Sequence, residues 1–291
     1  MRTRIRILCA FAGWAASFAT LGATVPSTII RSESGYSVAL GGLTQDYNET
    51  VGGAVVDQET GTIPMITLGA SSISTNPQGG TYWRVLGRYA DGNTAYNGQT
   101  LAGTPAQTTT ANTIFDINGR VGFASGIGHH MALIPYFEIG EHHWQRNVGS
   151  GQGAGGIEHY TNGYIGAGLL WEIALNRRWA LAVHGMTGYT FGAQITATDP
   201  VYIDSATGQV YYATATEALG DSSYESAGVR ATYLINHAWR SFIRVDVTHF
   251  AYGASIAVPI FYSSGTGQNG YYEPDSTTTQ VFVTAGVGVR F

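Results

Sequence analysis

The sequence predicts an all-β fold: a transmembrane, antiparallel, up-and-down β-barrel of about ten strands, with eight or twelve as the alternatives. Three observations predict it. The chain begins with an export leader, long segments alternate apolar and polar residues with period two, and the connections alternate between short and long. Alternation over ten or more residues is typical of strands that cross a membrane at a tilt, whereas strands of soluble sandwiches are shorter.

The amino-acid composition excludes several classes of protein. Of the 291 residues only 11% are charged, 40 are glycine and one is cysteine, and all 14 basic residues are arginine. This balance argues against a disordered tail, a disulfide scaffold and a nucleic-acid binder. We therefore expect no nucleic-acid partner.

Residues 1–23 have the features of a cleaved signal peptide. Three arginines lie in the first six positions, an apolar stretch follows to about Leu21, and small residues at 19, 22 and 23 suit a signal peptidase. Cys9 lies in this stretch, so disulfides and thiol chemistry are excluded from the mature chain. We expect residues 24–291 to form one barrel domain, in which no stretch approaches the roughly 18 apolar residues of a membrane helix.

Ten strands follow from the alternation. Their approximate spans are 36–49, 62–72, 80–92, 111–125, 131–145, 158–174, 178–194, 223–235, 239–256 and 277–291, the second having the weakest pattern. The short connections are then 73–79, 126–130, 175–177 and 236–238, and the long ones are 50–61, 93–110, 146–157, 195–222 and 257–276. Short turns on one side and long loops on the other are typical of bacterial outer-membrane barrels, with both termini in the periplasm.

Three strands show most clearly which face meets lipid. The last strand has an aliphatic and aromatic outer face, made by Val281, Val283, Ala285, Val287, Val289 and Phe291. The strand from Trp179 has Leu181, Val183, Gly185, Thr187, Tyr189 and Phe191 outward, and the strand from Trp239 has Ser241, Ile243, Val245 and Val247 outward. Trp171, Trp179 and Trp239 flank tight turns and predict a periplasmic aromatic girdle.

The opposite faces carry most of the charge, and we expect these side chains to face the lumen. They are Arg84, Arg88, Asp116, Arg120, Glu138, Glu172, Arg230, Arg240, Arg244, Asp246 and Arg290. Buried charges must be paired. If these charges interlock, they form a structural polar plug; if the seven arginines exceed the four acids in an open lumen, they form a constriction that favours anions.

The end of the chain carries a recognisable pattern. Phe291 is the last residue, and outward aliphatic residues precede it at Val287 and Val289, a pattern that resembles the C-terminal signal read by the barrel-assembly machinery. The segments VLGRYADGNTAYNG at 85–98 and ALIPYFEIG at 132–140 resemble uncharacterised small bacterial outer-membrane β-barrel proteins of porin-like type. The resemblance implies an outer-membrane location and contacts with outer-membrane lipid, lipopolysaccharide and the assembly machinery, and it implies no activity.

The residue spacing argues against two kinds of barrel enzyme. Ten strands are also the architecture of omptin proteases, which need an Asp–His dyad, but Asp246 and His249 are three residues apart and fall on opposite faces of a strand. No histidine is followed by serine two residues later, as barrel lipases and lipid A deacylases require. We expect no enzyme activity.

Paired histidines raise the question of a metal site. His129 and His130 lie at one end of a strand, and His142 and His143 lie at the other end with His159 beyond. Adjacent histidines point to opposite faces, so a metal site formed with Glu141 or Glu158 is the less favoured interpretation, and a hydrated cluster is the favoured one. We expect no metal and no cofactor.

The sequence thus leaves three hypotheses for function. The leading one is a porin-like barrel that stabilises the outer membrane or passes small solutes slowly, with a preference for anions if the lumen is open. The second is adhesion or ligand binding by the long loops. The third is a hydrolase at the barrel mouth.

Overall fold

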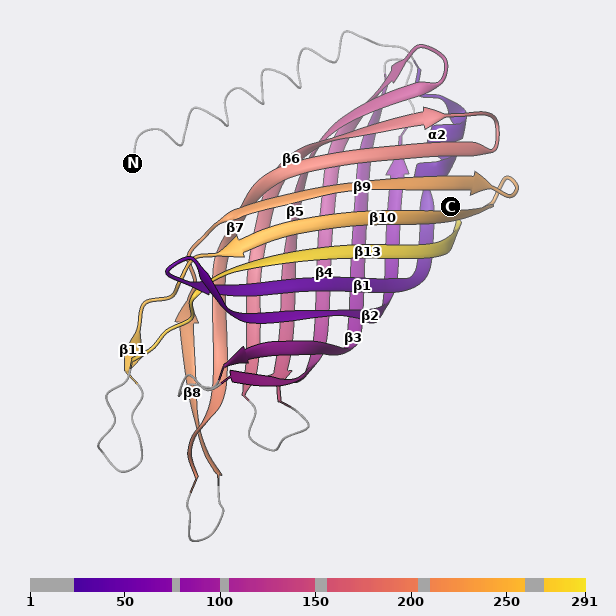
Figure 1. The fold of residues 1–291 in the computed structure, drawn as a ribbon. Coiled ribbons are helices and arrows are strands. Elements are labelled where there is room, and N and C mark those ends of the chain that lie inside the picture. Colours follow the sequence, from indigo (N-terminus) through magenta and orange to yellow (C-terminus); the bar gives the residue numbers. More distant parts are fainter. Residues whose placement is uncertain (1–23, 75–78, 100–104, 150–155, 204–209, 260–269) are drawn as a thin grey trace, which may run out of the picture.

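The computed structural model describes residues 24–291 except 75–78, 100–104, 150–155, 204–209 and 260–269. The predicted signal peptide, residues 1–23, lies outside the described residues. Ten antiparallel strands close into a barrel (Figure 1). They are β1 (Gly35–Val51), β2 (Ala54–Ile73), β3 (Gly80–Gln99), β4 (Pro105–Ile127), β5 (Met131–Val148), β6 (Ile157–Ala174), β7 (Trp179–Ile203), β9 (Ser223–Leu234), β10 (Trp239–Tyr252) and β13 (Asp275–Val289).

Three pairings between strands that are not consecutive in the numbering complete the closure, and one of them joins β10 to β13. The first strand pairs with the last, from Tyr36 opposite Val289 to Thr50 opposite Asp275, and β7 pairs with β9 because β8 (Val210–Ala218) lies to one side. Every edge within the wall is therefore satisfied, as a membrane barrel requires. The predicted ten-stranded antiparallel barrel is confirmed.

The outer wall carries an apolar belt. Predicted outward residues such as Val183, Ile243 and Val287 are exposed, and Ile243 is 60% exposed. Trp171, Trp179 and Trp239 are also exposed, beside the tight turns where the aromatic girdle was predicted. A belt of exposed aliphatic and aromatic side chains around a closed barrel is the surface that lipid requires.

The strands continue past this belt at one end of the barrel. On β1 the outward residues change from Tyr36, Val38 and Leu40 to Thr44 and Asp46 as the chain proceeds. We call the end toward which β1 runs the loop end, and the opposite end, which holds the C-terminus, the turn end. The wall of β1 beyond about Thr44 therefore has the polar outer surface expected outside the membrane.

The first connection differs from the prediction. A long loop was expected over 50–61, with a strand only over 62–72, but β1 and β2 join through Gly52 and Gly53 alone. Both glycines have positive φ, 60° and 85°, which is the conformation that a two-residue hairpin turn needs. The prediction missed the extension because both strands are polar above the belt, where the Thr44 and Thr62 hydroxyls lie 2.8 Å apart across the pair.

Other loop-end connections contain further strands. The predicted 195–222 loop holds the end of β7 and all of β8, which pair from Gln194 opposite Ala218 to Ile203 opposite Val210 and project beyond the barrel (Figure 1). The predicted 257–276 loop holds the short pair β11 (Val258–Pro259) and β12 (Gly270–Tyr271). Strand pairing thus extends past the membrane because cross-strand hydrogen bonds do not require an apolar face.

Two tight turns at the turn end share one design. Asn176 Oδ1 accepts hydrogen bonds from the backbone N–H groups of Arg178 and Trp179, at 2.8 and 3.0 Å. Asn236 Oδ1 accepts the equivalent bonds from Ala238 and Trp239, both at 2.9 Å. Asparagine favours such turns because its side chain replaces a backbone acceptor.

A helix that the sequence analysis did not predict precedes the barrel. α2 (Ser27–Glu33) follows Pro26, and its Ile29 is fully buried while Thr28, Ser32 and Glu33 are also buried. It contacts β2, β6, β7 and β9, so it lies within the turn end of the barrel. Among the described residues, no helix is long and apolar enough to cross a membrane.

The Gly52–Gly53 turn gives a prediction about stability. Gly53→Ala should lower the free energy of unfolding by about 1 kcal/mol. The Cβ of alanine strains the left-handed conformation, and no atom lies within 4 Å of that Cβ to make an offsetting contact. Urea titration of the barrel refolded into lipid vesicles measures this change. Gly185→Ala, at an outward position with equally open space, is the matched control; equal stability of the two variants would contradict the turn assignment.

Candidate functional site: the filled lumen

The lumen holds three successive groups of polar and aromatic side chains between the turn end and the loop end. We name the group around α2 the plug layer (Glu33, Glu172, Arg230 and Arg240). The middle group is the charge network (Arg84, Arg88, Arg120, Glu138, His184, Arg244 and Asp246), and the group around Arg146 is the mouth cluster (Glu49, Glu59, Arg146, Glu158 and Glu273). Inward positions on alternate residues of each strand supply them, as the period of two requires.

The plug layer fixes α2 by polar contacts. Glu33 forms an ion pair with Arg230, whose Nη2 also donates to Glu172 Oε1 at 3.0 Å. Arg240 Nη1 donates to the backbone carbonyl oxygens of Ser34 and Arg31. The helix is thus held mainly by arginines of β9 and β10.

The charge network joins strands that are distant around the barrel. Asp246 of β10 accepts from Arg88 Nη2 at 3.0 Å and Arg244 Nε at 2.6 Å, and His184 Nε2 lies 3.7 Å from it. Because Arg88 belongs to β3 and His184 to β7, this carboxylate ties opposite walls together.

A second carboxylate braces the other side of the network. Glu138 of β5 pairs with Arg120 of β4, its Oε2 lies 3.9 Å from Arg84 Nη2, and its Oε1 accepts from the Tyr164 hydroxyl at 3.3 Å. Arg120 also stacks over the Tyr136 ring, 4.4 Å from its centroid. Each buried charge here has a partner, which is the condition for charges in a low-dielectric interior.

Aromatic rings close the lumen above this network. Tyr164 and Tyr224 stack with centroids 4.1 Å apart, Phe250 packs next to Tyr224, and Tyr160 stacks on Tyr252. All of these rings are buried. The rings therefore separate the charge network from the loop end.

The mouth cluster lies beyond the apolar belt and centres on Arg146. Its Nη1 lies 3.3 Å from Glu49 Oε1 and 2.8 Å from Glu158 Oε2, and its Nε lies 3.1 Å from Glu59 Oε2. These carboxylates come from β1, β2 and β6, so one guanidinium joins three strands. A bidentate, planar guanidinium suits this task better than a lysine.

A fourth carboxylate enters the mouth cluster from the segment before β13. Glu273 Oε1 accepts from the hydroxyls of Tyr160 at 2.6 Å and Tyr47 at 3.2 Å. Burial, reinforced by the charge of Glu49, raises the pKa of Glu273 well above its usual range. Burial also raises the pKa of Glu49 to about 7, against the opposing effect of Arg146.

Two small cavities inside the lumen are lined wholly by described residues. One cavity of about 30 Å³ lies beside α2, and a second of about 10 Å³ lies between Tyr82, Arg120 and His184. Of the two arrangements that the sequence left open, the described residues adopt the interlocked one.

The structure separates Arg290 from the other predicted lumen charges. Ten of them lie inside the barrel wall, where Arg230 is partly buried and the rest are buried, whereas Arg290 is exposed. The expectation for Arg290 is corrected because β13 ends at Val289, so the next side chain lies at the rim, in reach of water. Arg178 is likewise exposed, in the turn before β7.

Several residues of the site were not predicted. Glu59, Arg146 and Glu273 lie in segments predicted as loops, and Glu33 lies before the first predicted strand, whereas Glu49 is the last residue of the predicted strand 36–49. Continuing the period of two from Glu138 along β5 would have placed both His142 and Arg146 inward. Glu33 carried no such signal, because it lies on a helix that only the barrel stabilises.

The residues that could have formed an Asp–His dyad or a metal site do not come together. Asp246 is buried and His249 is exposed on the outer wall, so they lie on opposite faces as expected. His142 points inward and pairs with Asp116 at 2.5 Å, whereas His143 points outward and pairs with Glu141 at 2.8 Å. Within the described residues no three histidine, cysteine or acidic side chains gather in a way that could hold a metal ion.

The predicted assembly residues lie on the outer wall of β13 and just after it. Val287 and Phe291 are exposed, and Val289 is partly so. The Phe291 ring contacts Tyr36, with centroids 5.2 Å apart, and stacks on Trp83. The C-terminal residue is therefore part of the aromatic surface at the turn end.

The mouth cluster predicts a pH dependence. Because the pKa of Glu49 is higher in the folded protein than its value of 4.5 when unfolded, its contribution to stability is complete below about pH 4.5 and is lost as the pH rises through about 7. The free energy of unfolding, measured by urea titration, should fall over this interval. Glu49→Gln should remove up to about 3 kcal/mol of that fall. The exposed Glu225→Gln is the control, and a fall that is identical in both variants would contradict the burial of Glu49.

Comparison with known proteins identifies the fold. No protein-family model matches the sequence, and no curated protein does. Among solved structures, the outer-membrane protease OmpT from Escherichia coli matches with a TM-score of 0.52 and 13% identity, over 92% of this chain and 98% of that chain. OprG from Pseudomonas aeruginosa (TM-score 0.35, 12% identity, 90% and 99% covered) and the toluene transporter TodX from Pseudomonas putida (0.35, 10%, 92% and 92%) also match. The chain thus has the fold of bacterial outer-membrane β-barrels, as its resemblance implied.

Proposed function

We propose that this protein is an integral barrel of the bacterial outer membrane that is shut at rest and passes small solutes slowly, anions in preference, when α2 leaves the turn end. The observation that carries the proposal is the character of the lumen: a network of paired charges lies among its apolar and aromatic side chains, and a seven-residue helix completes the filling. The loop end then faces outward and the turn end faces the periplasm.

A charged filling supports passage more than a purely structural role. An apolar filling would stay dry after any rearrangement, whereas walls lined by arginine and carboxylate side chains become wet once space appears. α2 is the element most easily moved, since Ile29 is its one fully buried apolar side chain and the other strong contacts are polar. Release of α2 also removes Glu33 and so leaves Arg230 facing the open space.

Conductance in a planar bilayer tests the proposal. The wild type should be nearly silent. Glu33→Gln removes a charge-assisted contact of about 1.5–3 kcal/mol, which should raise the open-to-closed ratio about 10- to 100-fold and produce discrete steps that favour anions. Glu33→Lys, which repels Arg230, should open the barrel further.

The control for this experiment is Glu225→Gln, which removes one carboxylate from the outer wall. Heat-modifiable gel mobility confirms that each variant has folded. Silent Glu33 variants that are correctly folded would overturn gated passage and leave a structural barrel. Steps that favour cations would overturn the arginine-lined path.

We also propose that the barrel is not an enzyme. The Asp116–His142 pair is the closest approach to a catalytic dyad, yet both side chains are buried, and Phe250 packs against the imidazole with ring centroids 5.2 Å apart. A substrate entering from the loop end would meet Arg146 and the aromatic rings first.

Refolded protein should therefore hydrolyse neither peptides nor phospholipid or lipid A esters above the rate of a heat-unfolded sample. His142→Gln should leave that background unchanged. Turnover by the wild type that disappears in His142→Gln or Asp116→Asn would show that the pair is catalytic.

The remaining expectations belong to the same proposal. Cleavage after about residue 23 would free the segment that leads into α2. Val287, Val289 and Phe291 would present the signal for the barrel-assembly machinery, and the apolar belt would contact outer-membrane lipid and lipopolysaccharide.

A further inference from the structure

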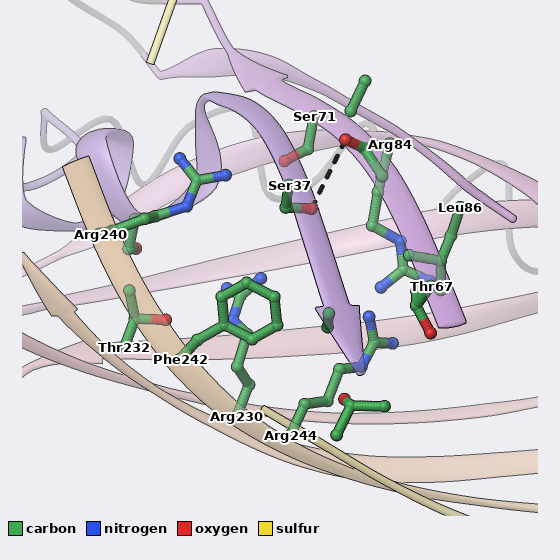
Figure 2. A pocket seen from close by; sticks show the side chains of 15 residues that line it. Ser37, Thr67, Ser71, Arg84, Leu86, Arg230, Thr232, Arg240, Phe242 and Arg244 are labelled. Carbon is green, nitrogen blue, oxygen red and sulfur yellow. Dashed lines mark hydrogen bonds between the residues drawn. The ribbon is translucent and has the colours of Figure 1, made fainter. Parts of the chain in front are cut away.

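The cavity beside α2 has an unusual lining. Figure 2 shows Arg84, Arg230, Arg240 and Arg244 around one pocket. Its volume is about 30 Å³. These four arginines come from β3, β9 and β10, and Ser32 of α2 closes the space from the turn end. Of the residues that line the cavity, none carries a carboxylate.

Hydroxyl groups fill much of the remaining lining. They belong to Ser32, Ser37, Thr67, Ser71, Thr232 and Thr284. The hydroxyls of Ser32, Ser37 and Ser71 already donate to backbone carbonyl oxygens. The remaining donors are three threonine hydroxyls and the guanidinium N–H groups, which cannot accept. The cavity is therefore strongly biased toward an acceptor.

Buried donors at this cavity lack partners. Arg84 Nε, Arg230 Nε and Arg244 Nη2 are shielded from solvent and have no hydrogen-bond partner among the described residues, and neither does Thr67 Oγ1. Leaving such groups unpaired costs free energy. No ion pair within the described chain involves Arg240, whose Nη1 donates to backbone carbonyl oxygens instead.

The charges around the cavity do not balance. Between α2 and the aromatic rings the described lumen holds six arginines, Arg84, Arg88, Arg120, Arg230, Arg240 and Arg244. The carboxylates there are five: Glu33, Asp116, Glu138, Glu172 and Asp246. One positive charge is in excess among side chains that are buried or partly buried.

We propose that this cavity binds one small monovalent anion of the size of chloride, held by Arg84, Arg230, Arg240 and Arg244. A site for one water needs roughly 10–15 Å³ of such volume, so the cavity has room for a halide, and the single excess charge favours a monovalent anion over sulfate. One bound halide neutralises the excess charge and accepts from the unpaired donors. A water molecule supplies an acceptor but no charge.

The test compares the folded barrel in different salts. Wild type, Arg240→Met, Thr67→Val and Thr60→Val are refolded into lipid vesicles and unfolded by urea in sodium chloride, bromide, sulfate or gluconate at equal ionic strength. Thr60 lies on β2, as Thr67 does, but faces outward, so its variant is the matched control. Crystals soaked in bromide then locate the ion by anomalous diffraction.

Chloride and bromide should raise the urea midpoint of the wild type and of Thr60→Val saturably, whereas sulfate and gluconate should not. The shift should disappear in Arg240→Met and shrink in Thr67→Val, and the bromide peak should lie among the four arginines. Thr67→Val, an isosteric change, keeps the test valid if Arg240→Met does not fold.

Three results would overturn the site: equal midpoints in all salts, an equal shift in sulfate, or a halide shift of full size in both Arg240→Met and Thr67→Val. The inference does not rest on gated passage, because the anion is bound in the closed barrel. Failure of the conductance experiment would therefore leave it standing.

Discussion

The cost of holding charge in a lumen that lipid surrounds is the constraint on which the rest of this structure depends. Strand alternation sends one set of side chains to lipid and the other into a narrow interior, where unpaired charges are costly. Asp246 and Glu138 meet this constraint by gathering cations from several strands. The same contacts that neutralise the charges also brace the wall across the barrel.

The two ends of the barrel satisfy that constraint in different ways. At the turn end a helix supplies Glu33 and backbone carbonyl oxygens to Arg230 and Arg240, so closure depends on a segment joined to the wall by one connection. At the loop end Arg146 is surrounded by carboxylates above the apolar belt. At the loop end carboxylates outnumber arginines, and the burial of these carboxylates sets the response of stability to pH.

The excess of arginines over carboxylates in the middle of the lumen and at the turn end underlies both the proposed anion path and the proposed halide site. The arginines that exceed their carboxylates would favour anions in an opened path, and in the closed barrel they surround a cavity of halide size. A bound halide and Glu33 therefore act on the same set of guanidinium groups. In this arrangement the plug and the ion each reduce the repulsion that would otherwise loosen β9 and β10.

The sequence by itself determined the barrel, an even strand number near ten, the lipid-facing residues and the inward position of most charges, because a period of two needs only local information. It did not reveal α2, whose seven residues are too few to be stable without the wall, nor the extension of β1 and β2, which have no apolar face above the membrane. Which charges pair across the barrel was decided by tertiary structure alone. Arg88 meets Asp246 and Arg230 meets Glu33 because barrel closure brings distant strands and the N-terminal helix together.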